Sequence, residues 1–250
     1  MNLLIFGATG GTGRILVEQA LAQGHIVTAF ARNPAKVRTT HQNLRVVKGD
    51  ILKFDSIEIA LAGQDAVLST LGVRVKAIPI IAIVVICQII ARLAGLIGPV
   101  GWLVRIGGPL IAIPILYSRN TTLSEGTKNI VRAMETLGVK RFVCESSIGI
   151  GDSKGKLGLL YNVVLIPLLL KGIFADKEIQ ENAIKESKLD WIIVRPGRLT
   201  NGPKRGAYRD GRDIGSKLIS VSISRADVAD FMLRQAKEDS HLRKTPGLAY

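Results

Sequence analysis

The sequence is poor in cysteine, in aromatic residues and in targeting signals. Its two cysteines, Cys87 and Cys144, lie in apolar surroundings without the spacing of metal ligands, which favours buried reduced thiols and predicts no metal site. Aromatic residues make up 5% of the chain and are not interleaved with its basic runs, which argues against a nucleic-acid partner. The chain starts on an apolar run with no basic region or cleavage site before it, and we therefore expect a cytoplasmic protein.

Acidic residues are also few, and the formal net charge is +14. The excess is densest in residues 191–250, which carry 12 basic and 6 acidic groups. A cationic excess of this kind suits an anionic cofactor, nucleic acid or an anionic membrane surface. With nucleic acid disfavoured, a cofactor and a membrane are the partners to consider.

The N-terminal stretch of about thirty residues has the pattern of a dinucleotide-binding βαβ unit. A buried strand, NLLIF, leads into the glycine turn GATGGTGR, a helix, ILVEQALAQG, and a second strand, HIVTAFAR. Gly7 allows the tight turn, Gly10 lets the backbone approach a pyrophosphate, and Gly13 lets the helix pack close to the strand. Because helix N-terminal amides bind phosphates, the expected cofactor-binding residues of the turn are Gly7, Thr9, Gly10, Gly11, Thr12 and Gly13.

The residues after the second strand indicate which nucleotide is bound. An acid there favours NAD, whereas an arginine accommodates the 2′-phosphate of NADP. The stretch FARNPAK offers Arg32, Asn33 and Lys36 and no acid, so NADP(H) is preferred over NAD(H), with a solvated basic loop as the alternative. After the third strand, Asp50 is placed to meet the adenine edge, with Ile51 beside it.

Strands and helices alternate along the chain, which predicts an α/β fold with a doubly wound, mainly parallel sheet and helices on both faces. The expected third to sixth strands are NLRVVKGD, DAVLSTLG, VKRFVCESS and LDWIIVRPG, and the expected amphipathic helix is EGTKNIVRAMETLG. Ligands of such sheets bind at the carboxyl ends of the strands. The fourth strand ends there with the expected cofactor-binding residues Ser69, Thr70, Leu71 and Gly72.

Beyond the sixth strand, the polar, glycine-rich residues 201–215 are typical of a mobile surface loop near the site. A short strand and a helix follow, with Ser224 as the N-cap and Asp227 at the third helical position.

The chain resembles an atypical short-chain dehydrogenase/reductase of the NmrA-like or biliverdin reductase B-like kind. The resemblance covers residues 2–72 and 121–235, through GATGGTGR, ARNPAKV, SEGTKNIVRAMETLGVKRFV, DWIIVRPGRLTNGP and ISRADVADFMLRQ. It implies an NAD(P)-binding Rossmann-like fold with Ser147 beside the nicotinamide, although Ser147 also suits a hydroxyl that bonds backbone. It further implies that Lys177 bonds the nicotinamide ribose. The alternative for Lys177 is an ordinary lysine on a solvated helix face. The residues that it places along the nicotinamide amide are Pro196, Gly197, Arg198 and Leu199.

The usual proton-transfer pair of this superfamily, a tyrosine followed four residues later by a lysine, is missing. None of the four tyrosines has a lysine at that spacing, and Ile173, four residues before Lys177, cannot transfer a proton. Ser147 and Lys177 are the remaining candidate catalytic residues. The absence disfavours a simple alcohol dehydrogenase and favours an acceptor whose product anion is delocalised, such as a flavin, a quinone or a linear tetrapyrrole.

An apolar insertion at 76–118 follows the fourth strand within what we expect to be a single domain over 1–250. Its pieces are shorter than the about 20 apolar residues of a membrane-spanning helix and are broken by glycine and proline. A second apolar run covers residues 157–170. Residues 77–117 and 157–170 can form extra core, a cap over a lipophilic substrate, or a surface that enters an anionic membrane interface.

The sequence therefore predicts an NADP(H)-binding protein, monomeric or homodimeric, that reduces a lipophilic or conjugated small molecule of quinone, flavin, tetrapyrrole or isoprenoid type. The alternative is a non-catalytic NADP-binding sensor, or an assembly or scaffold protein, attached to the cytoplasmic face of a membrane. An isomerase or epimerase is a more distant alternative, because it would also use the missing tyrosine.

Overall fold

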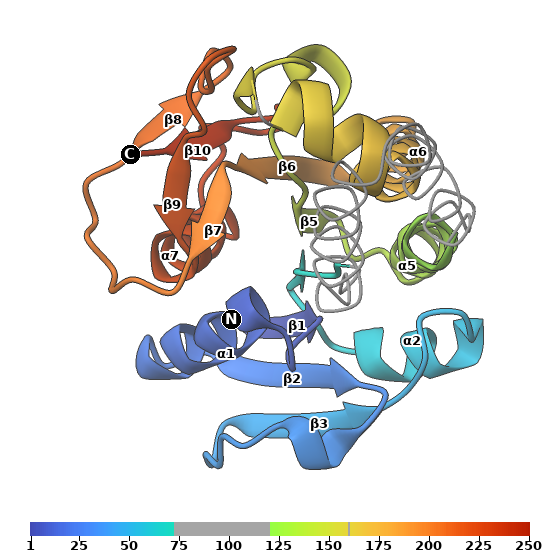
Figure 1. The fold of residues 1–250 in the computed structure, drawn as a ribbon. Coiled ribbons are helices and arrows are strands. Elements are labelled where there is room, and N and C mark those ends of the chain that lie inside the picture. The colour runs from blue at the N-terminus through green and yellow to red at the C-terminus, as the bar shows by residue number, and fades with distance from the viewer. Residues whose placement is uncertain (73–120, 160) are drawn as a thin grey trace, which may run out of the picture.

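The computed structural model describes residues 1–72, 121–159 and 161–250. The apolar insertion predicted at 76–118 falls outside these residues. The described part contains an eight-stranded sheet in the order β3-β2-β1-β4-β5-β6-β10-β8 (Figure 1). The strands are β1 (Asn2–Phe6), β2 (Ile26–Ala31), β3 (Leu44–Lys48), β4 (Ala66–Ser69), β5 (Arg141–Glu145), β6 (Asp190–Pro196), β8 (Arg209–Gly211) and β10 (Gly247–Ala249).

The pairing confirms the predicted doubly wound, mainly parallel sheet. Neighbouring strands are parallel from β3 through to β10, and β8 pairs antiparallel with β10. Strand β1 lies between β2 and β4, so the chain builds outward first on one side of β1 and then on the other. The crevice at the carboxyl ends of β1 and β4 is the place where such sheets bind ligands.

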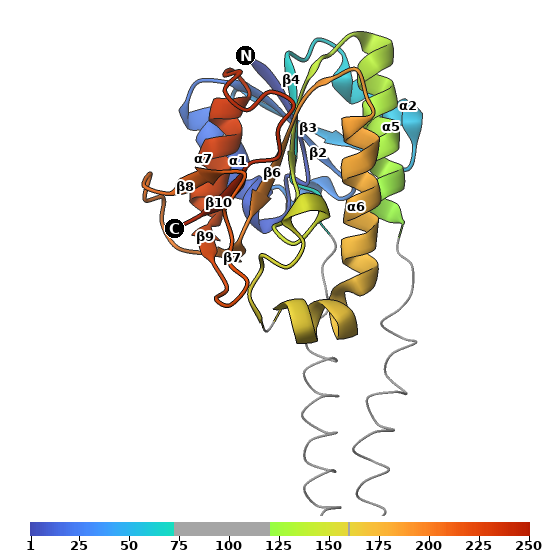
Figure 2. The same ribbon diagram turned by 90° about the horizontal axis from the view of Figure 1, so that it is seen from above.

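Helices cover both faces of the sheet, as the alternating pattern predicted. Helices α1 (Gly11–Ala22) and α7 (Arg225–Gln235) lie on one face, and α2 (Phe54–Leu61), α5 (Thr122–Leu137) and α6 (Lys171–Lys185) lie on the other (Figure 2). A second, two-stranded parallel sheet joins β7 (Arg198–Thr200) to β9 (Ser222–Ser224).

Burial on both faces explains why the central strands are apolar at most positions. In β1, Leu3 and Ile5 pack into the core under α1 and α7, whereas Leu4 and Phe6 pack into the core under α2, α5 and α6. Successive side chains of a strand point to opposite faces, so a strand that is covered on both sides favours apolar residues on both faces. All four of these side chains are fully buried.

Side-chain caps fix where two of the helices begin. Ser224 accepts a hydrogen bond from the Asp227 amide at 3.0 Å, which confirms the predicted N-cap of α7. Helix α5 is capped from another helix, because the buried Asp176 carboxylate of α6 accepts from the amides of Leu123 and Ser124, both at 3.2 Å. This long-range cap fixes the start of α5 against α6.

The segment predicted as a mobile loop at 201–215 differs from the prediction. Its residues Arg209–Gly211 form the edge strand β8. The Asp227 carboxylate accepts hydrogen bonds from the amides of Arg205 and Gly206 and from the Tyr250 hydroxyl. These contacts tie the segment to α7 and to the C-terminal residue.

The apolar run at 157–170 contains a π-helix, Tyr161–Leu170, that leads directly into α6. Figure 2 shows it beyond the carboxyl ends of the sheet strands, which is the side where such sheets bind ligands. Within residues 1–72, 121–159 and 161–250, no helix has both the length and the apolar character needed to cross a membrane.

Candidate functional site

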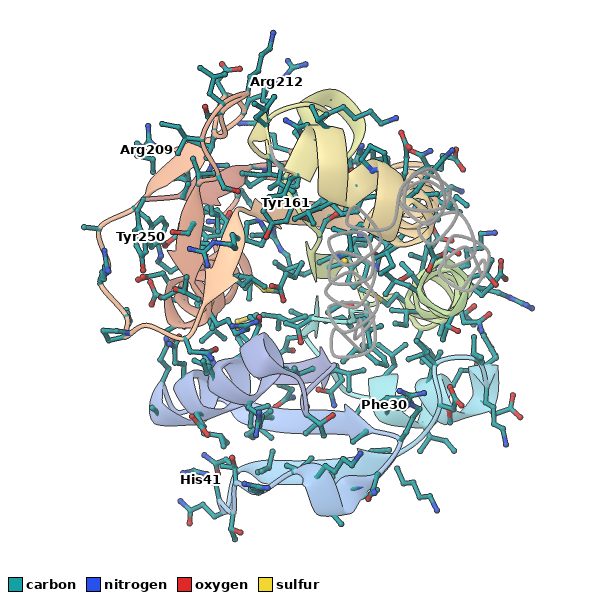
Figure 3. All side chains as sticks on the ribbon, viewed as in Figure 1. Phe30, His41, Tyr161, Arg209, Arg212 and Tyr250 are labelled. Carbon is teal, nitrogen blue, oxygen red and sulfur yellow. The ribbon has the colours of Figure 1, made fainter. Side chains whose placement is uncertain are left out.

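A cleft of about 490 Å³ opens at the carboxyl ends of β1, β2 and β4. Of the residues expected to bind a cofactor, it is lined by Gly7, Thr9, Gly10, Arg32, Asp50, Ile51, Thr70, Leu71 and Gly72. Lys36 and Phe30 also line it, and Figure 3 shows Phe30 at the end of β2 that faces this site. Five separate parts of the sequence thus meet at one cleft, at the point where the strand order reverses.

The glycine turn leaves the start of helix α1 open. The Gly10 amide donates to the Gly7 carbonyl at 2.8 Å, and Gly7 has a φ of 78°, which a residue with a side chain rarely adopts. A Cβ at Gly13 would lie 2.1 Å from the Gly7 carbonyl oxygen, so only glycine allows this approach of helix to strand. The N-cap residue of α1 has no side chain to bond the first amides, and the first turn carries no acid. Free amides of this kind bind phosphate.

The cationic residues that were expected to select NADP lie on the β2 side of the cleft. Arg32 and Lys36 are exposed and line the cleft. Asn33 does not line it, because its side-chain oxygen accepts from the Ala35 amide at 3.2 Å and caps the short 3₁₀ turn Pro34–Lys36. Asp50 also lines the cleft, and its carboxylate accepts from the Leu52 amide at 3.1 Å.

Residues at the ends of β4 and β5 divide between the cleft and the core. Thr70 is nine-tenths buried and lines the cleft, and its hydroxyl donates to the Phe6 carbonyl at 3.1 Å. Ser69 is fully buried opposite Cys144 and is not among the lining residues. Burial raises the pKa of the Cys144 thiol to about 12, so this cysteine is an inert core residue, as predicted.

The residues expected near the nicotinamide lie outside the cleft formed by the described residues. The Ser147 hydroxyl donates to the Ile148 carbonyl at 3.0 Å, which is the backbone-bonding role considered as its alternative. The Gly197 amide donates to Leu248, and the Arg198 amide donates to Val221, both at 2.9 Å. The segment Pro196–Leu199 therefore connects β6 and β10 to the small β7–β9 sheet.

Glu145, at the end of β5, is a candidate site residue that sequence reasoning missed. It is buried, and its carboxylate accepts from the Thr12 hydroxyl of helix α1 at 3.1 Å. Burial raises its pKa, and the nearby Lys177 ammonium, the Thr12 bond and Arg225 act in the opposite direction. Lys177 thus lies near enough to this carboxyl group to act on its pKa. A charged residue inside the apolar strand VKRFVCESS was the available signal.

Arg225, the first residue of α7, is a second residue that was missed. A Cβ at Gly11 would lie 2.6 Å from the Arg225 Nε, so the guanidinium group packs on the first residue of α1. Its Nη1 donates to the Asn201 side chain at 2.6 Å. An arginine beside uncapped helix amides adds positive charge where a phosphate would bind. Only the tertiary structure brings the starts of α7 and α1 together.

The fold and the glycine cradle define a protein of the Rossmann-like, nucleotide-binding class. Residues 7–98 and 102–239 match the model of an NAD(P)H-binding family, and the chain belongs to this family. The match confirms, at this level, the resemblance to atypical short-chain dehydrogenases/reductases drawn from the sequence.

Known proteins with the same architecture include two reductase-type structures. An anaerobilin reductase from Escherichia coli superposes with a TM-score of 0.71 at 21% identity, over 100% of this chain and 97% of that one. A short-chain dehydrogenase/reductase from Veillonella parvula, solved with NADP, gives a TM-score of 0.68 at 17% identity, over 100% and 94% of the two chains. At these identities the likeness shows the fold.

Two curated relatives are more similar in sequence. An uncharacterized chloroplastic protein of Arabidopsis thaliana is 29% identical over 82% of this chain, and a photosystem II assembly factor of Synechocystis is 24% identical over 98% of it. The chain spans 61% of the length of each of these relatives.

Proposed function

We propose that this protein is an NADPH-dependent reductase of a lipophilic or conjugated acceptor. The observation that carries the proposal is the cleft in which the glycine turn before an uncapped helix and two cationic residues from the end of β2 lie together. The amides and Arg225 suit a pyrophosphate, and Arg32 with Lys36 suits a 2′-phosphate. When bound, the nicotinamide supplies a hydride.

The acceptor class is inferred from the groups near the site. No tyrosine–lysine pair is present to protonate a simple alkoxide. Several apolar side chains are exposed around the π-helix and the segment that pairs with Leu159, among them Leu218 at 74% and Ile219 at 72% exposure. Exposed apolar side chains beside basic residues such as Lys217 support uptake of a lipophilic substrate at an anionic membrane surface.

NADPH oxidation by conjugated acceptors tests the proposal. NADPH and NADH fluorescence is followed on adding the protein, and then on adding FMN, a short-chain quinone and biliverdin, with and without anionic lipid vesicles. We expect tight NADPH binding and oxidation of NADPH by at least one acceptor. If NADPH binds tightly but no acceptor oxidises it, with or without vesicles, this reductase activity is excluded. If neither NADPH nor NADH binds, the nucleotide site itself is excluded.

Replacing Arg32 by alanine is expected to weaken NADPH binding by about tenfold or more while leaving NADH binding unchanged, since one charge-assisted bond to the 2′-phosphate is lost. The measurement is a fluorescence titration with both nucleotides. Arg38→Ala is the matched control, because Arg38 is an exposed arginine of the same segment that does not line the cleft. Equal losses for NADPH and NADH in Arg32→Ala would contradict the assigned role.

A non-catalytic NADP-binding assembly factor is the second candidate. It is favoured by the similarity to a photosystem II assembly factor, which extends over 98% of this chain. In this case the nucleotide site would report the cofactor state to a partner protein. NADPH binding without turnover, together with NADPH-dependent retention of a partner complex, would favour it over the reductase.

A further inference from the structure

A second cavity, of about 740 Å³, lies against β6 and the segment 241–246 that leads into β10. It shares no lining residue with the cleft at β1 and β4. Figure 3 shows one of its lining residues, Arg212, at the outer edge of the molecule near β8. The cavity therefore belongs to the other end of the sheet.

The charged side chains that line this second cavity are predominantly cationic. They are Lys185, Arg212, Arg243 and Lys244, and among the described lining residues Asp152 is the one carboxylate. Asp152 is already engaged in an ion pair with the buried Arg195. The surplus of basic residues noticed at the end of the sequence is thus partly gathered in one concave site.

Arg243 is the cation in this cavity that is most available to a ligand. Its side chain is exposed and makes no hydrogen bond or ion pair that involves residues 1–72, 121–159 or 161–250. By contrast, Lys185 bonds Glu181 at 3.2 Å and Lys244 donates to the Ser240 carbonyl at 3.1 Å. A ligand anion would give the Arg243 guanidinium a partner.

The backbone holds Arg243 in an unfavourable conformation. Its φ is 55°, and it is the one non-glycine residue with a positive φ in the described part of the chain. Its amide donates to the Trp191 carbonyl at 2.8 Å, and the next residue, Lys244, accepts from the Ile193 amide at 3.1 Å. Left-handed backbone at an arginine costs about 1 kcal/mol or more and persists where the surroundings impose it, often at binding sites.

We propose that this second cavity binds a small molecule that carries two or more phosphate or carboxylate groups. Arg243 and Lys244 take the anionic groups, with Lys185 and Arg212 as further cations, and the edge of Trp191 contacts the rest of the ligand. A volume of this order accommodates a small organic ligand. The site is separate from the proposed nucleotide cleft and does not depend on the proposed reaction.

Trp191 fluorescence provides the test. The chain has two tryptophans, so Trp102→Phe leaves Trp191 as the only reporter. The protein is titrated with pyrophosphate, with citrate and, to match ionic strength, with chloride. We expect saturable quenching by pyrophosphate or citrate and none by chloride, and which anion binds tighter distinguishes phosphate from carboxylate ligands. Calorimetric titration of the unmodified chain checks that Trp102→Phe has no effect of its own.

The variant Arg243→Asn/Lys244→Gln is expected to weaken this binding at least about tenfold. Asparagine tolerates a positive φ, so the backbone is retained. The matched control is Arg45→Gln/Lys48→Gln, which removes two exposed cations from the edge strand β3 and lowers the net charge equally. Equal weakening in both variants, or an unmodified protein that binds neither anion, would overturn the proposal. NADPH affinity, measured in parallel, should be unchanged in the cavity variant.

Discussion

Replacing Gly13 by alanine is expected to abolish NADPH binding and to lower the free energy of unfolding by about 3 kcal/mol. The added Cβ would lie 2.1 Å from the Gly7 carbonyl oxygen and 2.7 Å from the Thr70 Oγ1. The Gly7 oxygen belongs to the backbone, and the Thr70 hydroxyl is buried and bonded to the Phe6 carbonyl. Neither can easily move aside, so helix α1 must shift away from β1. Alanine improves intrinsic helix propensity by about 1 kcal/mol, which is too little to offset this clash.

Urea unfolding and an NADPH titration measure the two effects of Gly13→Ala. The matched control is Gly10→Ala in the same turn, whose Cβ would lie 3.1 Å from the same Gly7 oxygen. A shift of a few tenths of an ångström relieves this contact, so we expect the control to lose much less stability. A Gly13→Ala protein that binds NADPH normally would show that the close approach of α1 to β1 is not what forms the phosphate site.

Replacing Glu181 by glutamine is expected to cost about 3 kcal/mol of stability, because it leaves the Arg195 guanidinium buried with one partner fewer. Both side chains of this ion pair are almost fully buried, at 1% and 2% exposure. Arg195 donates to both carboxylate oxygens, from Nε at 3.0 Å and from Nη2 at 2.6 Å, and Ser146 donates at 2.7 Å. Removing one member of a buried pair leaves the other without adequate compensation.

The same pair makes stability depend on pH. Burial favours the neutral form of Glu181, but the Arg195 bonds and charge outweigh burial and hold its pKa below the ordinary value of 4.5. A lowered folded-state pKa means that the contribution is fully present above pH 4.5 and is lost as the pH falls through the folded-state value. The stability difference between the unmodified chain and Glu181→Gln should therefore be largest above pH 4.5 and shrink in acid.

Urea unfolding of the unmodified chain and of Glu181→Gln, at pH 7 and over a series of lower pH values, measures the loss of stability and its pH dependence. The control is Glu125→Gln, which breaks the exposed Lys128–Glu125 pair of α5 and should cost less than about 0.5 kcal/mol. The double variant Glu181→Leu/Arg195→Met should be more stable than Glu181→Gln, because it leaves no unpaired charge in the core. A loss below about 1 kcal/mol in Glu181→Gln would refute the assigned role of the pair.

Much of the fold could be predicted because its information is local. The first six strands are mainly apolar runs bounded by glycine and polar residues, and the helices between them repeat at helical spacing. The strands β8 and β10 could not be found in this way. Each is three residues long, and β8 lies in a polar, glycine-rich stretch whose strand conformation depends on pairing with a distant segment.

The candidate site, like the fold, could be predicted only where its residues belong to local sequence motifs. Glycines with fixed roles and the basic residues after the second strand are sequence motifs, and the structure places Gly7, Gly10 and Arg32 at one cleft. Asn33 and Ser69 were expected there too, but local geometry turns the first toward its own turn and buries the second. Side-chain direction at a strand end depends on neighbouring strands, which a motif does not specify.

The sequence by itself determined the alternation of strands and helices, the glycine turn and the cationic end of β2, because each depends on neighbouring residues along the chain. Tertiary structure decided which charges meet. It placed Arg225 over Gly11, Glu145 against Thr12, and Arg243 in a cavity with Lys185. These pairs are separated by tens to hundreds of residues and are brought together only because burial of apolar strand faces fixes the order of the sheet.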